Sequence, residues 1–324
     1  MIVRFPMRVV TGTELVAHKG GVRLFVWRKR AADAAESKSP VLLLVHGSSL
    51  SALPTFDLQV PEAHDYSMMD WYASRGFDVW TVDHEGYGRS TLTEGNSDVS
   101  CGVEDLKAVA GLIAKVTGEQ RICVYGLSSG ALRAAAFAAA APERVERLVL
   151  DAFVWTGEGS PTLAKRREGA EFFRTNTRRP IDRDFIASIF TRDHEGTSEP
   201  AVIDACAAAQ LAYGDSVPTG TYLDMTCNLP VVNPADITAP TLIVRGEHDG
   251  IASIEDLLAF FRQLPSPDKQ ISVIPGLAHC TPLGIHRRRM WRTVQCFLNA
   301  TAVEQSSSIK QTARFARHRI TRRS

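Results

Sequence analysis

The pentapeptide Gly126-Leu127-Ser128-Ser129-Gly130 is the clearest place in the chain for nucleophilic chemistry. It stands between a strand-like run at residues 121–125 and an alanine-rich, helix-like run, which is the context that a G-x-S-x-G turn requires. At such a turn the chain leaves a buried strand and enters a helix, so the serine is held in a strained conformation for which glycine neighbours leave room. The pattern therefore predicts Ser128 as the nucleophile. Ser129 is the alternative, although it lies outside the central position.

A serine hydroxyl is a poor nucleophile at neutral pH, so it needs a base that takes its proton and an acid that orients the base. Two later turns supply these groups, because Asp249 and His279 each follow an apolar run. Both turns come just after the carboxyl ends of predicted parallel strands, where open α/β sheets place their sites. We therefore expect Ser128, Asp249 and His279 to converge. The alternatives are Glu247 and Asp151 for the acid, and His46, His84, His248 and His286 for the base.

The elements that must position these residues alternate along the chain. Apolar runs typical of buried parallel strands occur at residues 41–45, 77–82, 121–125, 147–150, 241–244 and 270–274. Helical patterns occur at residues 67–75, 102–117, 129–140, 254–264 and 283–300. Two short runs, 13–18 and 22–28, predict an antiparallel hairpin. The alternation indicates an α/β fold in which helices cover both faces of a mostly parallel central sheet.

The alternation breaks once, because residues 154–233 show helical patterns but no buried strand. We interpret this region as an inserted helical cap, with a core made of residues 1–153 and 234–302 and a flexible basic tail at 303–324. The cap region carries apolar side chains that either line a substrate pocket or pack against one another. It also carries basic side chains that either steer an anionic substrate or face solvent. The two sets are Trp155, Phe172, Phe173, Phe190, Tyr213, Tyr222 and Met225, and Lys165, Arg166, Arg167, Arg174, Arg178, Arg179 and Arg183.

Composition narrows the class of protein. The 324 residues are 44% hydrophobic and 23% charged, which suits one large core with an insertion, and the net charge of +1 gives no general attraction to nucleic acid or membrane. No signal-peptide pattern and no apolar run of ~20 residues is present. The six cysteines form no C-x-x-C pair, so we expect a cytoplasmic protein with reduced thiols, although a pair between Cys206 and Cys227 remains an alternative in an exported protein. Neither H-E-x-x-H nor a P-loop occurs, so we expect no metal and no cofactor.

The chain resembles the α/β-hydrolase superfamily, and in particular its capped esterase-like or carbon–carbon hydrolase-like branches. The resemblance spans residues 10–300 and rests on four motifs in order. They are His46-Gly47-Ser48-Ser49, Asp83-His84-Glu85-Gly86-Tyr87-Gly88-Arg89-Ser90, the serine turn, and the Asp249 and His279 turns. The resemblance implies Ser128 as nucleophile, His279 as general base and then acid, and Asp249 as the orienting carboxylate. It also implies an oxyanion hole made by the backbone N–H groups of Ser48 and Ser129.

These features predict a serine hydrolase that cleaves a carboxylic ester of a small or medium, partly apolar substrate through an acyl-enzyme. A carbon–carbon bond hydrolase, an acyltransferase and a non-catalytic small-ligand receptor remain alternatives on the same fold. A serine nucleophile disfavours the dehalogenase and epoxide hydrolase branches, which use aspartate. We expect Ser49 and Trp155 to contact the substrate. Asp83 is expected to bind backbone donors, and Cys280 to be a small buried residue.

Overall fold

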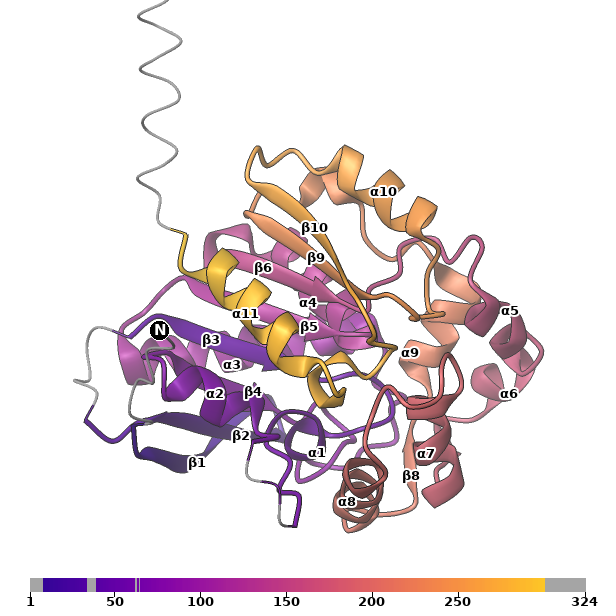
Figure 1. The fold of residues 1–324 in the computed structure, drawn as a ribbon, viewed down its shortest axis with the longest axis horizontal. Coiled ribbons are helices and arrows are strands. Elements are labelled where there is room, and N and C mark those ends of the chain that lie inside the picture. The colour runs from indigo at the N-terminus through magenta and orange to yellow at the C-terminus, as the bar shows by residue number, and fades with distance from the viewer. Residues whose placement is uncertain (1–7, 34–38, 62, 64, 301–324) are drawn as a thin grey trace, which may run out of the picture.

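The computed structural model describes residues 8–33, 39–61, 63 and 65–300. An eight-stranded sheet forms its centre, in the order β1-β2-β4-β3-β5-β6-β9-β10 (Figure 1). The strands are β1 (Val10–Lys19), β2 (Val22–Ala31), β3 (Val41–Val45), β4 (Asp78–Val82), β5 (Ile122–Leu127), β6 (Val145–Asp151), β9 (Thr241–Gly246) and β10 (Lys269–Ile274). β1 pairs antiparallel with β2, and β2 with β4, while all other neighbours are parallel. The predicted hairpin and mostly parallel sheet are confirmed.

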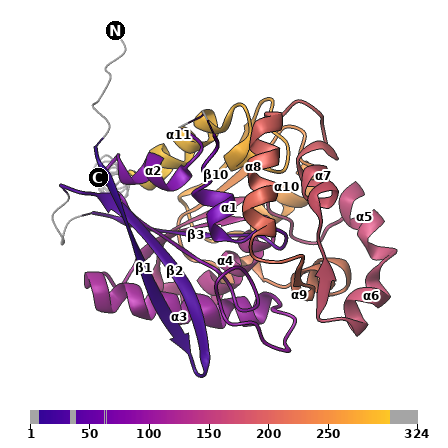
Figure 2. The same ribbon diagram turned by 90° about the horizontal axis from the view of Figure 1, so that it is seen from below.

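Helices cover both faces of this sheet, as the sequence predicts. Strand β3 is buried on both sides, and its side chains alternate between two apolar clusters: Leu43 joins one, and Leu42 and Leu44 join the other. The first cluster includes α3 (Val99–Thr117), α4 (Ser129–Ala140) and α10 (Ile254–Gln263), and the second includes α1 (Ala52–Phe56), α2 (Met68–Ala73) and α11 (Arg287–Leu298). Figure 2 shows α3 on one side of the sheet and α2 and α11 on the other. Each fully buried aliphatic side chain stabilises this sandwich by about 1.5–3 kcal/mol.

Three of the six core helices named above begin at a side-chain cap, and α4 is among those that do not. Ser67, Asp98 and Ser253 each accept a hydrogen bond from a backbone N–H in the first turn of α2, α3 and α10. The residue before α4 is Ser128, which makes no such bond. The turn after β5 therefore sets the start of α4, and it leaves the first N–H groups of this helix without a side-chain acceptor.

The segment between β6 and β9 gathers at one end of the sheet, at the right of Figure 1. It contains α5 (Pro161–Arg167), α6 (Ala170–Thr175), α7 (Arg183–Thr191), α8 (Pro200–Leu211) and α9 (Gly220–Leu223), and the paired strands β7 (Arg178–Pro180) and β8 (Ser216–Pro218). The prediction that this region lacks strands was incomplete, because three-residue strands are too short to show a period of two. The first helical pattern of this region forms two helices, α5 and α6, which separate at Gly169, a residue that disfavours the helix interior.

Three further features bear on the composition-based expectations. All six cysteines are free thiols, so Cys206 and Cys227 do not pair. Within the ranges that the structure describes, no helix has both the length and the apolar character needed to cross a membrane. The basic tail predicted at 303–324 lies outside the described residues.

Candidate active site

Ser128 sits in the sharp turn between β5 and α4. Its backbone has φ 58° and ψ −124°, a conformation that residues other than glycine rarely adopt. Two glycines make the turn possible, because a Cβ at Gly126 would lie 2.4 Å from the oxygen of Gly130, and one at Gly130 would lie 2.3 Å from the oxygen of Val45. The Ser128 N–H donates to the oxygen of Asp151 at 2.8 Å, which fixes the turn against β6.

The structure brings the three predicted side chains together. His279 Nε2 lies 3.0 Å from Ser128 Oγ, and His279 Nδ1 lies 2.9 Å from Asp249 Oδ1. Asp249 follows β9 and His279 follows β10, which are neighbours in the sheet, so their turns meet at the same edge. All three residues are buried. The bond to Asp249 orients the ring with its proton on Nδ1, which leaves Nε2 free to accept the Ser128 hydroxyl proton.

The two candidate acids differ in partner and in charge. Burial opposes ionisation of Asp249, but the positive charge of His279 and hydrogen bonds from its ring and a backbone N–H outweigh burial and lower the pKa. Asp151 instead accepts hydrogen bonds from the hydroxyls of Tyr125 and Thr281, and burial raises its pKa to about 7. His279 is therefore oriented by the ionised carboxylate of Asp249, and Asp151 makes no bond to it among the described contacts.

Other candidate residues have structural contacts. Glu247 accepts the N–H of Gly276 at 2.8 Å, and the His248 ring stacks on His194 at 4.0 Å between ring centroids. His46 is buried, and its Nε2 accepts a backbone N–H from the turn after β4 at 3.1 Å. These side chains support turns around the site without bonding to the proposed nucleophile.

Two neighbouring predictions concern buried polar groups. Asp83 accepts N–H groups from Ala52 and Arg89, so the expectation that it binds backbone donors is confirmed. Cys280 is buried as expected, and burial raises the pKa of its thiol to about 12, which keeps it protonated at neutral pH.

Two backbone N–H groups beside Ser128 are available to a ligand. Ser129 is the first residue of α4, and Ser48 follows β3. Within the described part of the chain, neither amide donates to a protein acceptor. The Ser129 amide also stands at the positive end of the α4 dipole, which favours negative charge at this position.

A small cavity of about 40 Å³ opens in front of Ser128. The turn after β3 lines it with Gly47, Ser48 and Ser49, and the segment between β6 and β9 lines it with Arg166, Ile189 and Arg192. A second cavity of about 810 Å³ shares Arg166 and Arg192 with the first. Sequence reasoning singled out neither Ile189 nor Arg192, because nothing in the local pattern of α7 distinguishes side chains that face this cavity.

The two predicted substrate contacts have different surroundings. Ser49 lines the small cavity, and its hydroxyl accepts a hydrogen bond from Arg179 Nη2 at 2.8 Å. Trp155 lies outside the lining of both cavities. Its indole N–H donates to the oxygen of Val232 at 3.2 Å, and its ring packs on Phe260 at 6.0 Å between centroids. These contacts make Trp155 a packing residue in this structure, and its contact with the substrate stays a prediction.

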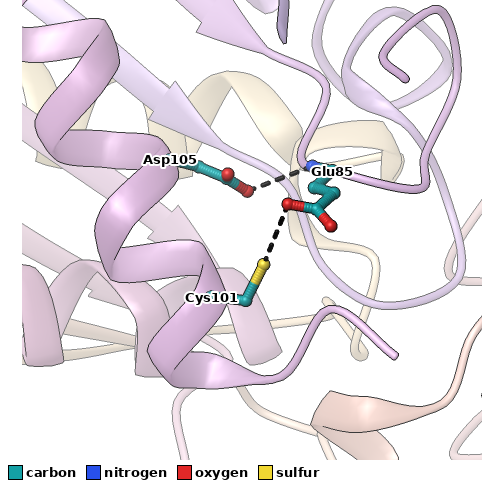
Figure 3. Close-up of side chains that lie close together, drawn as sticks. All are labelled: Glu85, Cys101 and Asp105. Carbon is teal, nitrogen blue, oxygen red and sulfur yellow. Dashed lines mark hydrogen bonds between the residues drawn. The ribbon is translucent and has the colours of Figure 1, made fainter. Parts of the chain in front are cut away.

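Two groups of side chains have donor types that suit a metal. Glu85, Cys101 and Asp105 lie together beside α3 (Figure 3). The ammonium of Lys19 already occupies this group, at 2.5 Å from Asp105 Oδ1 and 2.7 Å from Glu85 Oε2. These partners outweigh the effect of burial and raise the pKa of Lys19, so the cluster is a buried ion-pair network.

The second group is Asp193, Asp249 and His279. Both ring nitrogens of His279 already bond to Ser128 and Asp249, so a metal bound through this ring would have to break one of those contacts. The arrangement suits proton transfer at Ser128 without a metal.

Relatives of this chain include hydrolases of different bonds. The chain is 26% identical over 214 residues to the monoacylglycerol lipase of Mycolicibacterium smegmatis, covering 64% of this chain and 73% of that protein. It is also 26% identical over 282 residues to the 2-hydroxy-6-oxononadienedioate/2-hydroxy-6-oxononatrienedioate hydrolase of Paraburkholderia phymatum, covering 80% of this chain and 88% of that protein.

Solved structures share the fold. The 2-hydroxy-6-oxo-6-phenylhexa-2,4-dienoate hydrolase of a Rhodococcus strain matches with a TM-score of 0.66 at 18% identity, over 90% of this chain and 100% of that one. A thermophilic esterase from Thermogutta terrifontis matches with a TM-score of 0.62 at 23% identity, over 89% of this chain and 98% of that one.

A family model described as serine aminopeptidase, S33 matches residues 65–283, which is more than half of the chain. The matched region contains Ser128, Asp249 and His279, and the expected resemblance to α/β hydrolases is thereby confirmed. The chain belongs to this hydrolase family of the α/β-hydrolase superfamily.

Proposed function

We propose that this protein is a serine hydrolase that cleaves a carboxylic ester through an acyl-enzyme on Ser128. The observation that carries the proposal is the hydrogen-bonded chain from Ser128 Oγ to His279 Nε2 at 3.0 Å, and from His279 Nδ1 to Asp249 Oδ1 at 2.9 Å. A nucleophile bonded to a base that a carboxylate orients is what acyl transfer needs. The strained turn at Ser128 supports the same role, because it raises the hydroxyl above the sheet edge.

In the first half of the reaction, Ser128 Oγ attacks the ester carbonyl while His279 Nε2 takes the hydroxyl proton. The ionised Asp249 stabilises the imidazolium through the Nδ1–H group. The amides of Ser48 and Ser129 donate to the carbonyl oxygen as it becomes negative, and one such donor is worth about 3 kcal/mol in the transition state. The bond to the leaving alkoxide oxygen then breaks, and that oxygen takes the proton from Nε2.

In the second half, a water molecule replaces the departed alcohol. His279 Nε2 takes a proton from this water as the water oxygen attacks the acyl carbon. The bond between the acyl carbon and Ser128 Oγ breaks, and Oγ regains its proton from Nε2. The net reaction consumes one ester and one water, and it gives one carboxylic acid and one alcohol.

We also propose that residues 154–233 act as a cap over this site. Arg166, Ile189 and Arg192 come from this region and line the cavity in front of Ser128, which supports the proposal. A cap that closes over bound substrate excludes bulk water and strengthens electrostatic interactions inside the site.

Carbon–carbon bond hydrolysis is the second candidate. The 26% identity over 282 residues to the Paraburkholderia phymatum hydrolase favours it, just as the similarity to a monoacylglycerol lipase favours ester cleavage. Acyl transfer to an alcohol would use the same acyl-enzyme. A ligand receptor would bind without turnover.

Two measurements test the proposal. We expect the wild-type protein to hydrolyse short p-nitrophenyl esters and the Ser128→Ala variant to lose this activity by at least about a thousandfold. Ser272→Ala, on the edge strand β10, is the matched control and should retain activity. We also expect a fluorophosphonate probe to label Ser128, as mapped by peptide mass. Label on another residue, or full turnover by Ser128→Ala, would contradict the assignment.

Product analysis separates the remaining alternatives. If added alcohol captures the acyl group in preference to water, the enzyme is a transferase. If a 2-hydroxy-6-oxodienoate is cleaved much faster than any ester, carbon–carbon hydrolysis replaces ester hydrolysis as the function. Binding of a small ligand with no turnover of any of these compounds would favour a receptor.

A further inference from the structure

Two arginines flank one tyrosine at the border of the cavity in front of Ser128. The guanidinium carbon of Arg166 lies 4.1 Å from the ring centroid of Tyr222, and that of Arg179 lies 4.0 Å from it. Arg166 lines both the small cavity at Ser128 and the larger outer cavity, and Tyr222 lines the outer cavity. Arg179 also donates from Nη2 to Ser49 Oγ at 2.8 Å. Arg166 therefore stands where the two cavities meet, and Arg179, which is outside the lining of both cavities, adds a second positive charge against the same tyrosine ring.

These charges have no carboxylate partner. Among the residues that the structure describes, no carboxylate oxygen lies within 4.0 Å of a guanidinium nitrogen of Arg166 or Arg179. Arg192, which also lines both cavities, does have one, because its Nε lies 3.3 Å from Asp193 Oδ1. Arg179 is only 5% exposed, and its Nε is buried without a hydrogen-bond partner. A buried charge without a partner is costly, so this pair favours an anion beside it.

Ionisation of Tyr222 would offset only part of this positive charge. Burial opposes ionisation of its phenol, but the charges of Arg166 and Arg179 outweigh burial and lower its pKa to about 7. One phenolate would neutralise at most one of the two guanidinium charges. The ring presents its face to both guanidinium groups, which leaves N–H donors of Arg166 available for an in-plane acceptor, whereas Arg179 Nη2 already donates to the oxygen of Ser48 and to Ser49 Oγ.

We propose that Arg166 binds a carboxylate carried by the substrate and that the nearby charge of Arg179 strengthens this binding, so that the enzyme prefers esters with a negatively charged group. This inference rests on the proposed ester hydrolysis at Ser128. It specifies a substrate class, a half-ester of a dicarboxylic acid or an ester with an equivalent anionic end.

The sizes of the cavities agree with this placement. The inner cavity of about 40 Å³ accommodates little more than the reacting carbonyl and one or two water-sized groups. The rest of a substrate must therefore extend past Arg166 into the outer cavity of about 810 Å³, where Phe173 and Phe185 add apolar surface. A substrate that reaches both cavities passes the guanidinium groups, and its charge can be recognised there.

A matched pair of substrates tests the preference. The 4-nitrophenyl monoester of adipic acid carries a free carboxylate, and the same compound with that carboxylate methylated is neutral. We expect kcat/KM to be about 10- to 100-fold higher for the anionic ester, which is the range of one charge-assisted hydrogen-bonding contact. The ratio should fall as salt is added, because the binding is partly electrostatic.

Two arginine variants are compared by the same quantity, the ratio of kcat/KM for the anionic ester to kcat/KM for the neutral ester. Arg166→Gln should lower the ratio of anionic to neutral kcat/KM by about tenfold or more, chiefly through KM. Arg167→Gln is the control, because Arg167 is exposed on the same helix and lines neither cavity. Arg179→Gln should lower the ratio less than Arg166→Gln, because Arg179 lines neither cavity, and it should also lower kcat for both esters, because its bond to the oxygen of Ser48 is lost. Arg166→Gln therefore decides the outcome.

A binding measurement separates failure of this inference from failure of the proposed function. Adipate is titrated calorimetrically into the wild-type protein and the Arg166→Gln variant. Equal kcat/KM for the two esters, or an unchanged ratio in Arg166→Gln, overturns the inference and leaves ester hydrolysis intact. A different result would be that no ester is hydrolysed, that adipate binds, and that Arg166→Gln lowers the affinity for adipate at least tenfold. In that case the anion site is supported and the proposed function is overturned. Adipate binding that Arg166→Gln leaves unchanged overturns the anion site in either case.

Discussion

Replacing Ser128 by glycine should leave the protein more stable than replacing it by alanine. The residue has φ 58° and ψ −124°, where a Cβ atom is strained. Both replacements remove the hydroxyl and its bond to His279, but only glycine removes the Cβ. The difference between the two variants therefore isolates the backbone strain at the proposed nucleophile.

The expected difference follows from two opposing effects. A residue other than glycine in such a conformation costs about 1–3 kcal/mol. Glycine also gains conformational freedom in the unfolded chain, which offsets about 0.5–1 kcal/mol of this. We expect Ser128→Gly to exceed Ser128→Ala in free energy of unfolding by about 0.5–2 kcal/mol. In a chain of this size that is a Tm about 1–4 °C higher.

Urea unfolding followed by circular dichroism, with thermal scans at the same pH, measures this difference. The control is Ala108→Gly in the middle of α3, where the backbone is helical and glycine should destabilise by about 1 kcal/mol or more. The reasoning is refuted if Ser128→Ala is as stable as Ser128→Gly or more stable, since the turn would then hold no strain that a Cβ causes. Unequal m-values would show instead that the unfolded states differ.

Four further outcomes are expected. Asp249→Asn should lower kcat by about 10⁴ in an ester assay, because the amide disfavours the required histidine tautomer, while Asp151→Asn should stay within about tenfold. The pKa of Asp151 is raised to about 7, so its stabilising contribution is present below its unfolded value and is lost as pH rises through about 7. Urea unfolding should accordingly show Asp151→Asn gaining stability relative to wild type between pH 5 and pH 8. Lys19→Met should lower the free energy of unfolding by about 1–3 kcal/mol, because it leaves Asp105 buried without its ammonium, and dialysis against a chelator should leave Tm unchanged. Gly130→Ala should yield little folded protein by circular dichroism, because its Cβ would lie 2.3 Å from a backbone oxygen.

The strands and the convergence at Ser128 were predictable because each depends on local sequence. Strands buried on both faces appear as continuous apolar runs, and in a parallel sheet the turns after successive strands lie at one edge. Asp249 and His279 each follow such a strand, so their meeting with Ser128 needed no knowledge of side-chain contacts. The choice between Asp249 and Asp151 did need it. Asp151 ends β6 and Asp249 follows β9, and the bond from His279 Nδ1 to Asp249 distinguishes them.

What the sequence did not predict depends on distant contacts or short elements. The strands β7 and β8 are three residues long, and each pairs only with the other. Trp155 was grouped with the aromatic side chains of the predicted cap, and its partners Val232 and Phe260 lie far along the chain. Ile189 reaches the cavity from α7, and no periodicity identifies which apolar side chain of an amphipathic helix faces a cavity instead of a packed neighbour.

Arg179 illustrates how such a distant contact couples two parts of the site. Its Nη2 donates to the oxygen of Ser48 at 3.0 Å and to Ser49 Oγ at 2.8 Å, and so ties β7 to the turn that carries the proposed oxyanion donor Ser48. Holding this oxygen restricts rotation about Ser48, and a rigid turn keeps a donor aimed at a developing oxyanion. Removing Arg179 would therefore disturb both the turn and the proposed anion contact. Arg166 makes no bond to this turn, which is why its replacement by glutamine measures recognition of substrate charge more cleanly.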